Sequence, residues 1–254
     1  MNVVVCVKQV PDPNSAGQLD PATHRLKREG VEVVLDPGDE YGIEAGLQLA
    51  EATGGQVTVV SMGPEKALDA IRKALAMGAA KGVLISDEAL AGADALTTAR
   101  VLAAAVKREG FDLVVTATES TDASMGVVPQ LLAGLLDVPA LTFAKHVEAD
   151  GSTLKVNRQT EAGYDVIEAD LPALLSVTAG VFEPRYPSLK GIMAAKSKPV
   201  DRIGVGDLGL DGVGSGEEVV SVQPAEERKA GEIIEDDGTA AQRIVEFLAA
   251  QKVI

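Results

Sequence analysis

The residues best suited to chemistry lie in a hydroxyl-rich stretch between an apolar run and a helical pattern. Residues 113–116 are apolar and β-branched, and the run has the length of a buried strand. The polar stretch that follows consists of Thr118, Glu119, Ser120, Thr121, Asp122, Ala123 and Ser124. A helix N-terminus presents unpaired N–H groups and positive potential, and Ser and Thr hydroxyls add donors. The stretch therefore predicts a site for an anion such as a nucleotide phosphate.

The same residues also allow a simpler interpretation, in which they only cap the next helix. Ser, Thr and Asp are favoured N-cap residues, and Ser120, Thr121 and Asp122 are candidates for that position. The helix itself is predicted from the spacing of Val127, Val128, Leu131, Leu132 and Leu135. One cap needs only one or two such residues, and the stretch holds six polar ones. This excess favours nucleotide binding, but both interpretations stay open.

Composition and charge restrict the class of protein. The chain has 254 residues, of which 46% are hydrophobic and 3% aromatic, so aliphatic side chains must build its core. A net charge of −15 argues against sequence-independent nucleic-acid binding, which needs a basic surface. Cys6 is the single cysteine, which excludes a disulfide framework. The chain starts as a strand and has no apolar run that could span a bilayer, so we expect a cytoplasmic protein without membrane insertion.

Strand and helix patterns alternate along the first part of the chain. Strands are expected at residues 3–7, 31–35, 57–60, 83–85, 113–116 and 140–143. Helices are expected at 40–52, 65–77 and 93–108, the last capped by Asp94. This order predicts an α/β fold with a mostly parallel, twisted sheet and helices on both faces. Residues 154–158, 164–169 and 173–177 resemble antiparallel or mixed strands, which predicts a small antiparallel addition.

The last part of the chain has a different composition. Residues 204–239 are rich in Gly, Asp and Glu and lack a core-forming period, whereas 240–248 predicts a helix. We therefore expect an α/β domain at 1–199 and an extended C-terminal arm at 200–254 that wraps a partner chain.

Few residues offer catalytic chemistry. Neither His24 nor His146 has a Cys or a carboxylate at the spacing that a metal site or a catalytic triad requires. Cys6 lies in an apolar strand and is best interpreted as a small hydrophobic residue. Neither a P-loop nor a G-x-G-x-x-G turn after the first strand is present. The sequence predicts nucleotide binding without a metal or a catalytic apparatus.

A second informative stretch covers residues 183–198. Two prolines bracket Arg185 and Tyr186, which predicts a stiff loop. Leu189 stands in a polar setting, and a short basic helix is predicted from residues 192–198. Two interpretations remain open: Leu189 folds back into the core, or it is an apolar anchor of a docking site surrounded by cations.

Several motifs together identify a family. The segment F-E-P-R-Y-P-S-L-K-G-I-M-A-A-K at 182–196 is the most specific of them. It is joined by V-V-V-C-V-K-Q-V-P-D at 3–12 and T-E-S-T-D-A-S-M-G-V-V-P-Q at 118–130. With these motifs the chain resembles the small (beta) subunit of electron transfer flavoproteins, over essentially its whole length.

The resemblance implies a function that the residue patterns alone do not show. The family has an adenine-nucleotide-binding α/β fold and forms a heterodimer with an alpha subunit that holds most of an FAD, so that the FAD lies at the interface. The pair accepts electrons from flavin dehydrogenases such as acyl-CoA dehydrogenases. It passes them to a membrane quinone reductase or another acceptor. The small subunit is then an electron-carrier subunit rather than an enzyme, and it carries a structural AMP.

The resemblance also implies which residues form the sites. The AMP would be bound by Cys6, Asp36, Pro37, Gly38, Asp39, Met62, Thr118, Glu119, Ser120, Thr121, Asp122, Ala123, Ser124, Met125, Gly126, Val127, Val128 and Pro129. The redox partner would dock on Arg185, Tyr186, Leu189, Lys190, Ile192, Met193 and Lys196, with Leu189 as the anchor.

Two alternatives to an AMP-carrying subunit remain. The T-E-S-T-D form is typical of bacterial members, some of which bind a second FAD in place of AMP and bifurcate electrons from NADH. Those members tend to have a Thr beside the capping Asp94, where this chain has Ala95, so AMP is favoured. A different class, ATP-binding stress proteins or ATP-using enzymes, shares the architecture. The ATP-using enzymes would need an S-G-G-x-D-S loop after the first strand, and residues 8–12 do not resemble it.

Overall fold

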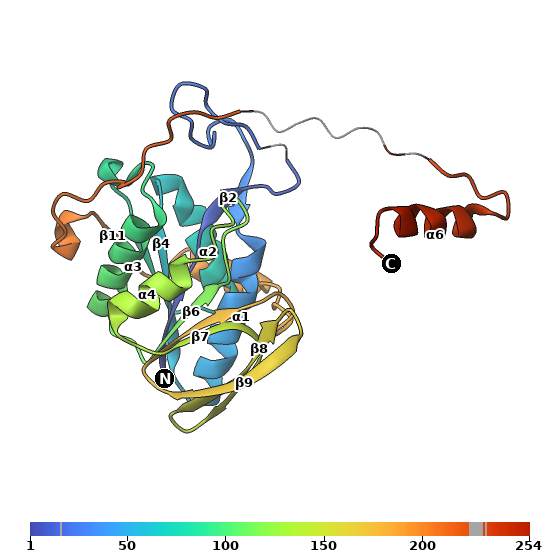
Figure 1. Ribbon diagram of the computed structural model, residues 1–254. Helices are drawn as coiled ribbons and strands as arrows, with labels where there is room; N and C mark the ends of the chain where they lie inside the picture. The colour runs from blue at the N-terminus through green and yellow to red at the C-terminus, as the bar shows by residue number, and fades with distance from the viewer. Residues whose placement is uncertain (16, 224–230, 232) are drawn as a thin grey trace. The chain divides into compact units, whose positions relative to one another are not determined.

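The computed structural model describes residues 1–15, 17–223, 231 and 233–254, and the described residues form two compact units, 1–219 and 220–254. Within the described residues of the first unit, nine strands form one sheet in the order β11-β5-β4-β1-β6-β10-β7-β8-β9 (Figure 1). The strands are β1 (Asn2–Cys6), β4 (Gln56–Met62), β5 (Lys81–Ile85), β6 (Leu113–Ala117), β7 (Ala140–Asp150), β8 (Thr153–Thr160), β9 (Gly163–Asp170), β10 (Ala173–Val177) and β11 (Val200–Ile203).

The pairing of these strands confirms the predicted fold class. Every neighbouring pair from β11 to β7 is parallel, and β7, β8 and β9 form the antiparallel addition. β10 is parallel to both of its neighbours, β6 and β7, and all five of its residues are buried. Of the three strands expected to be antiparallel or mixed, only β8 and β9 are therefore antiparallel.

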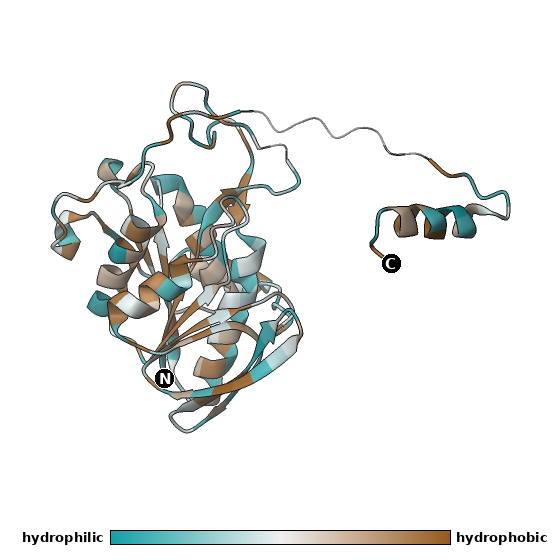
Figure 2. Ribbon diagram, viewed as in Figure 1, coloured by the Kyte–Doolittle hydropathy of each residue, from teal (hydrophilic) through white to brown (hydrophobic). Residues whose placement is uncertain are grey.

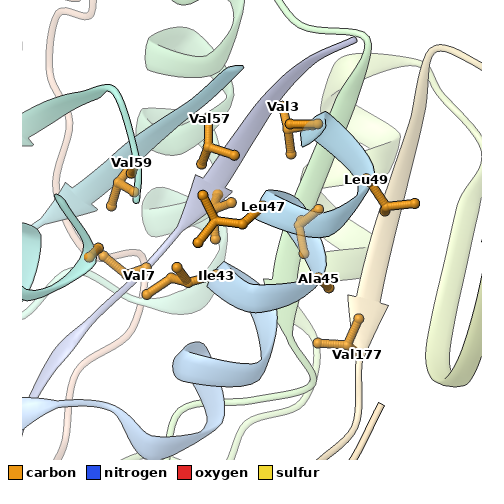
Figure 3. Close-up of a cluster of buried hydrophobic side chains, with 14 of the residues drawn as sticks. Val3, Val7, Ile43, Ala45, Leu47, Leu49, Val57, Val59 and Val177 are labelled. Carbon is orange, nitrogen blue, oxygen red and sulfur yellow. The ribbon is translucent and has the colours of Figure 1, made fainter. Parts of the chain in front are cut away.

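The helices pack on both faces of the sheet. In the first unit they are α1 (Pro37–Ala52), α2 (Leu68–Met77), α3 (Ala95–Glu109), α4 (Val128–Leu136) and α5 (Leu189–Ala195), with single 3-10 turns at Glu65–Ala67, Glu88–Leu90 and Gly206–Leu208. α1 and α2 cover one face, and α3 and α4 cover the other. Ile43 and Leu47 of α1 point toward the valines of the central strands (Figure 3). Hydrophobic residues are concentrated in these strands (Figure 2), so the core is aliphatic, as the composition predicts.

One expected strand of the main sheet is placed elsewhere. β3 (Val33–Leu35) pairs antiparallel with β2 (Gln9–Pro11), and among the described residues these two strands form a separate small sheet. The prediction that residues 31–35 continue the parallel alternation is therefore wrong. A parallel return needs a crossover, usually helical, and the described residues between 12 and 32 form no helix. The chain comes back along β2 in the opposite direction and enters α1 directly.

The first residues of the expected C-terminal arm, 200–203, belong to the main sheet as β11. β11 pairs with β5 at the sheet edge, although the sequence gives its four residues no recognisable strand pattern. The helix predicted at 240–248 is confirmed as α6 (Ala240–Ala250) in the second unit. Residues 224–230 and 232 of the expected arm lie outside the described residues, and its wrapping of a partner stays a prediction. In the described ranges, no helix combines the length and apolar character needed to cross a bilayer.

Candidate functional site

The polar loop leaves the carboxyl end of β6, the edge of an open α/β sheet where ligands bind. In the described part of the chain, α4 has Val127 as its N-cap residue and no side chain caps it. The interpretation that Ser120, Thr121 and Asp122 cap this helix is therefore wrong. These residues belong to a turn in which the N–H groups of Ala123 and Ser124 donate to the Ser120 carbonyl.

Asp36 joins this loop to the start of α1. Its carboxylate is fully buried, and Oδ1 accepts from the Gly38 N–H at 2.9 Å as the N-cap of α1. The other oxygen, Oδ2, accepts from the Thr121 N–H at 2.7 Å and from the Thr121 hydroxyl at 3.1 Å. Pro37 follows in the first turn of the helix, where its missing N–H costs nothing. The segment that the sequence presents as a strand-ending turn is thus a helix start bonded to the polar loop.

Asp122 is held by two cations from distant parts of the chain. Lys8 Nζ lies 2.6 Å from one carboxylate oxygen and Arg28 Nη2 lies 2.5 Å from the other. The Asp122 side chain is 5% exposed. Burial alone would raise its pKa, but the hydrogen bonds and charges of Lys8 and Arg28 outweigh burial and lower the pKa of this carboxyl. Lys8 Nζ also donates to the Ser120 hydroxyl, so one amine connects the segment between β1 and β2 to the polar loop.

Asp39 and Cys6 form the buried side of the same corner. Asp39 Oδ2 accepts from the Lys8 N–H at 2.7 Å. Burial, and then the neighbouring Asp36 carboxylate, raise the pKa of Asp39 well above its usual range. Burial, followed by the Asp39 charge, raises the pKa of the Cys6 thiol to about 12. Cys6 is therefore neutral at physiological pH, which agrees with its interpretation as a small hydrophobic residue.

A row of small polar side chains crosses the carboxyl end of the sheet beside Cys6. Val5 pairs with Val115, and Ser176 pairs with Thr116, so Cys6, Thr116 and Ser176 stand at neighbouring positions on β1, β6 and β10. Ser176 accepts from the Phe143 N–H, whereas the buried Thr116 hydroxyl has no hydrogen-bond partner among the described residues. A buried polar atom without a partner is costly in a finished structure, so this hydroxyl fits a ligand that would satisfy it.

The structure brings most of the expected nucleotide residues into one corner. Cys6, the segment 36–39 and the residues 120–122 meet through the contacts above. Thr118 donates through its hydroxyl to the Val177 carbonyl, and Glu119 is exposed. Met62 ends β4, the strand next to β1, and is half-buried. Residues 123–125 and 127 are exposed at the rim of the loop. That these residues bind a nucleotide stays a prediction.

Two residues of the corner were missed by sequence reasoning. Lys8 lies in the V-K-Q-V-P motif at the end of the first strand, which could have indicated it. Arg28 lies in an irregular segment, 94 residues from Asp122, and no local pattern marks it. It also donates to the Gln9 carbonyl at 3.1 Å and so ties the segment before β3 to this corner.

The second stretch forms an exposed face around α5. Leu189 is the first residue of α5 and is 83% exposed, and Ser188 caps the helix by accepting from the Gly191 N–H. The interpretation of Leu189 as a core residue is therefore wrong. Other exposed members of this face are Tyr186, Lys190, Ile192, Met193 and Lys196. Partner docking on this face stays a prediction.

Arg185 lies below this face and points to α1. Its guanidinium Nε donates to Glu44 at 2.8 Å, and Nη1 donates to Glu51 at 2.6 Å. Burial would raise the pKa of Glu44, but the bonds from Arg185 and Gln48 outweigh burial and lower it. Arg185 therefore fastens the loop to α1, and its charge is already balanced by two glutamates.

An open depression of about 530 Å³ lies beside α5, lined by residues that include Arg72, Ala76 and Ile192. Within the described residues, no group of His, Cys, Asp and Glu could hold a metal ion.

Comparisons with known proteins show which family the chain resembles. Residues 23–208 match the family described as electron transfer flavoprotein domain. The chain is 41% identical to the electron transfer flavoprotein subunit beta of Mycobacterium tuberculosis, covering 100% of this chain and 99% of that protein. It is 34% identical to the Megasphaera elsdenii subunit beta, with 100% of both chains covered. It is also 39% identical to the caffeyl-CoA reductase-Etf complex subunit CarD of Acetobacterium woodii, covering 83% of this chain and 80% of that protein.

Proposed function

The chain belongs to the electron transfer flavoprotein family, as a small (beta) subunit, and from this premise we propose that it carries a structural AMP and passes electrons from flavin dehydrogenases. It does so as half of a heterodimer with an alpha subunit, and the two share an FAD at their interface. The observation that carries the proposal is the corner around Asp36 and Asp122, where the polar loop meets a helix start. The strand β6, from which this loop leaves, carries the buried Thr116 hydroxyl, which has no hydrogen-bond partner among the described residues.

In this proposal the corner holds AMP through groups of this chain. The hydroxyls of Ser120 and Ser124 and the N–H groups that precede α4 would donate to the phosphate. The Thr116 hydroxyl and Cys6 would line the part that lies against the sheet. AMP contributes no redox chemistry here. It binds the folded chain and not the unfolded one, so it stabilises the fold.

The exposed face of α5 supports the electron-transfer part of the proposal. Leu189 presents an apolar anchor with Lys190 and Lys196 nearby, and acidic dehydrogenase surfaces would be attracted to such a face. Acyl-CoA dehydrogenases are the expected donors, and a quinone reductase or another redox protein is the expected acceptor.

Two variants test nucleotide binding by the polar loop. We expect Ser120→Ala and Ser124→Ala each to weaken binding by about 1.5–3 kcal/mol, because each removes a hydroxyl that would donate to the charged phosphate. Released nucleotide is measured in the purified heterodimer, together with its melting temperature. Ser152→Ala is the control, because Ser152 is exposed in the turn between β7 and β8. Full nucleotide content in both loop variants would contradict the proposal.

A second candidate function is favoured by one comparison. The Acetobacterium woodii relative is named as a subunit of a caffeyl-CoA reductase-Etf complex. That name suits a subunit that works with a reductase, and in the corresponding alternative this chain binds a second FAD in place of AMP and bifurcates electrons from NADH. Rapid reduction of the heterodimer by NADH would establish this alternative. Family membership removes the support for an ATP-binding stress protein or ATP-using enzyme.

A further inference from the structure

α5 packs against α2 with an unusually short distance between the two helix backbones. A Cβ atom at Gly191 would lie 2.4 Å from the Ala76 carbonyl oxygen of α2, closer than any real contact of that kind. The obstacle is helix backbone, which cannot rotate away as a side chain can. The underside of α5 is therefore pressed against α2, with Ala195 3% exposed, while Leu189, Ile192 and Met193 face outward.

Two cationic side chains join the C-terminal ends of α2 and α5 by donating to backbone carbonyls there. Arg72 of α2 donates through Nη1 to the carbonyls of Ala195, at 2.5 Å, and Lys198, at 2.9 Å, at the end of α5. Lys198 in turn donates through Nζ to the carbonyls of Leu75, at 2.8 Å, and Ala79, at 2.7 Å, at the end of α2. The last carbonyls of a helix lack intrahelical partners and carry negative potential. α2 thus supplies the cation at the end of α5, and the segment that follows α5 supplies the cation at the end of α2.

The Lys198 amine donates to backbone carbonyls and is set apart in this way from lysines such as Lys73. No carboxylate of the described residues forms an ion pair with it, and burial lowers the pKa of its amine. Other surface lysines of this chain, such as Lys73, pair with glutamates. In the part of the chain that the structure describes, the Lys198 amine donates only to carbonyl oxygens, so its role lies in the contact between α2 and α5 rather than in the surface charge.

We propose that Gly191, Arg72 and Lys198 are positioning residues that lock α5 against α2 and so hold its exposed apolar face in one orientation for the redox partner. The inference rests on the proposed function, in which that face receives a dehydrogenase. A short helix on a proline-bracketed loop would otherwise sample several orientations. Each binding event would then have to order it, which weakens association.

The first test uses one glycine and a matched glycine in another helix. In the heterodimer, Gly191→Ala moves α5 away from α2, and we expect the KM for the flavoprotein to rise about tenfold in reduction by a cognate acyl-CoA dehydrogenase, with kcat within about twofold. Reduction by dithionite stays unchanged, because the flavin site is intact. Gly134→Ala in α4 is the control, since a Cβ there meets nothing within 4 Å. It should leave KM unchanged.

The second test uses Lys198, so that the inference stays testable if Gly191→Ala does not fold. Lys198→Met should raise KM in the same assay, and Lys198→Arg should restore it because a guanidinium can still donate to both carbonyls. Lys145→Met is the control, because Lys145 Nζ donates to the Ala179 carbonyl outside this contact. Variants that melt earlier but keep the original KM would show a purely structural role and overturn the inference.

Leu189→Ala, assayed in parallel, separates this inference from the proposed function. If Leu189→Ala raises KM while Gly191→Ala and Lys198→Met do not, docking on α5 stands and the positioning role is wrong. If Leu189→Ala leaves KM unchanged, docking on this face is wrong, and the inference fails with it.

Discussion

The corner around Asp36 and the face of α5 differ in which side chains are buried and which are exposed to solvent. In the corner, buried carboxylates accept from donors in four segments of the chain, which are the segment between β1 and β2, α1, the polar loop and the segment before β3. At α5, Arg72 of α2 and Lys198 after α5 donate to backbone carbonyls in the contact between the two helices, and the apolar side chains of α5 remain in solvent. A corner of the first kind suits a ligand that stays bound, whereas a face of the second kind suits a partner that must leave after each electron transfer.

The comparison predicts that changes in the corner affect folding and changes on α5 affect encounter. The largest effect on stability is expected at Asp36. Asp36→Ala removes the N-cap of α1 and leaves the N–H groups of Gly38 and Thr121 without their acceptor, so we expect a loss of about 3 kcal/mol or more in the free energy of unfolding. Urea denaturation of the heterodimer measures it.

Asp20→Ala is the matched control for this change. Asp20 also accepts from two backbone N–H groups, those of Ala22 and Thr23, but in an exposed turn. It should cost no more than about 1 kcal/mol, because water replaces its bonds. Equal losses at the two positions would show that the corner is not a special centre of stability.

A smaller loss is expected for Asp122→Asn. The change leaves Lys8 and Arg28 without their shared charge, and about a third of each cation's side chain is exposed, so we expect a cost of about 1–2 kcal/mol. Glu65→Gln, which breaks the exposed pair with Arg202, should change stability by no more than about 0.5 kcal/mol. A double-mutant cycle with Arg28→Met gives the interaction free energy between Arg28 and Asp122. A value near zero would show that Arg28 does not stabilise the corner.

The pH dependence of the melting temperature tests whether the pKa of Asp39 is raised in the folded protein. Its pKa is raised in the folded state, so the stability that it contributes is complete below its unfolded pKa and is lost as pH rises through the folded value. Asp39→Asn has no proton to lose and can still accept from the Lys8 N–H. The melting temperature of the variant relative to the original protein should therefore increase with pH. A difference that stays constant between pH 4 and pH 8 would contradict the raised pKa.

The smallest stability effect is expected on α5. Leu189→Ala should change the free energy of unfolding by no more than about 0.5 kcal/mol, because the side chain is in solvent. Leu174→Ala, at a fully buried position of β10, should cost about 2–5 kcal/mol and serves as the core reference. Electron transfer should reverse this order, with Leu189→Ala weakening dehydrogenase binding by about 2 kcal/mol. Changes at Lys190 and Lys196 should matter less as salt rises.

Local patterns predicted much of this structure, and long-range contacts account for what they missed. The parallel strands, the Asp94 cap and the helix at the C-terminal end follow from periodicity and capping within a few residues. The β2–β3 pair and the edge strand β11 depend on partners far along the chain and are too short to show a period.

The candidate site shows the same limit. The hydroxyl-rich loop was visible in the sequence, and the resemblance to the family pointed to the segment 36–39. Its bond to Thr121 spans 85 residues, and the pairing of Arg28 with Asp122 spans 94. Exposure of Leu189 was equally undecided, because a single leucine between polar residues fits a core and a surface position alike.

The central claim is that this subunit holds AMP beside an FAD shared with the alpha subunit. Its most direct test is the identification of the nucleotides released when the purified heterodimer is denatured, by mass spectrometry and absorbance. The account predicts one AMP and one FAD for each heterodimer. Two FAD molecules and no AMP would contradict it and establish the bifurcating alternative instead.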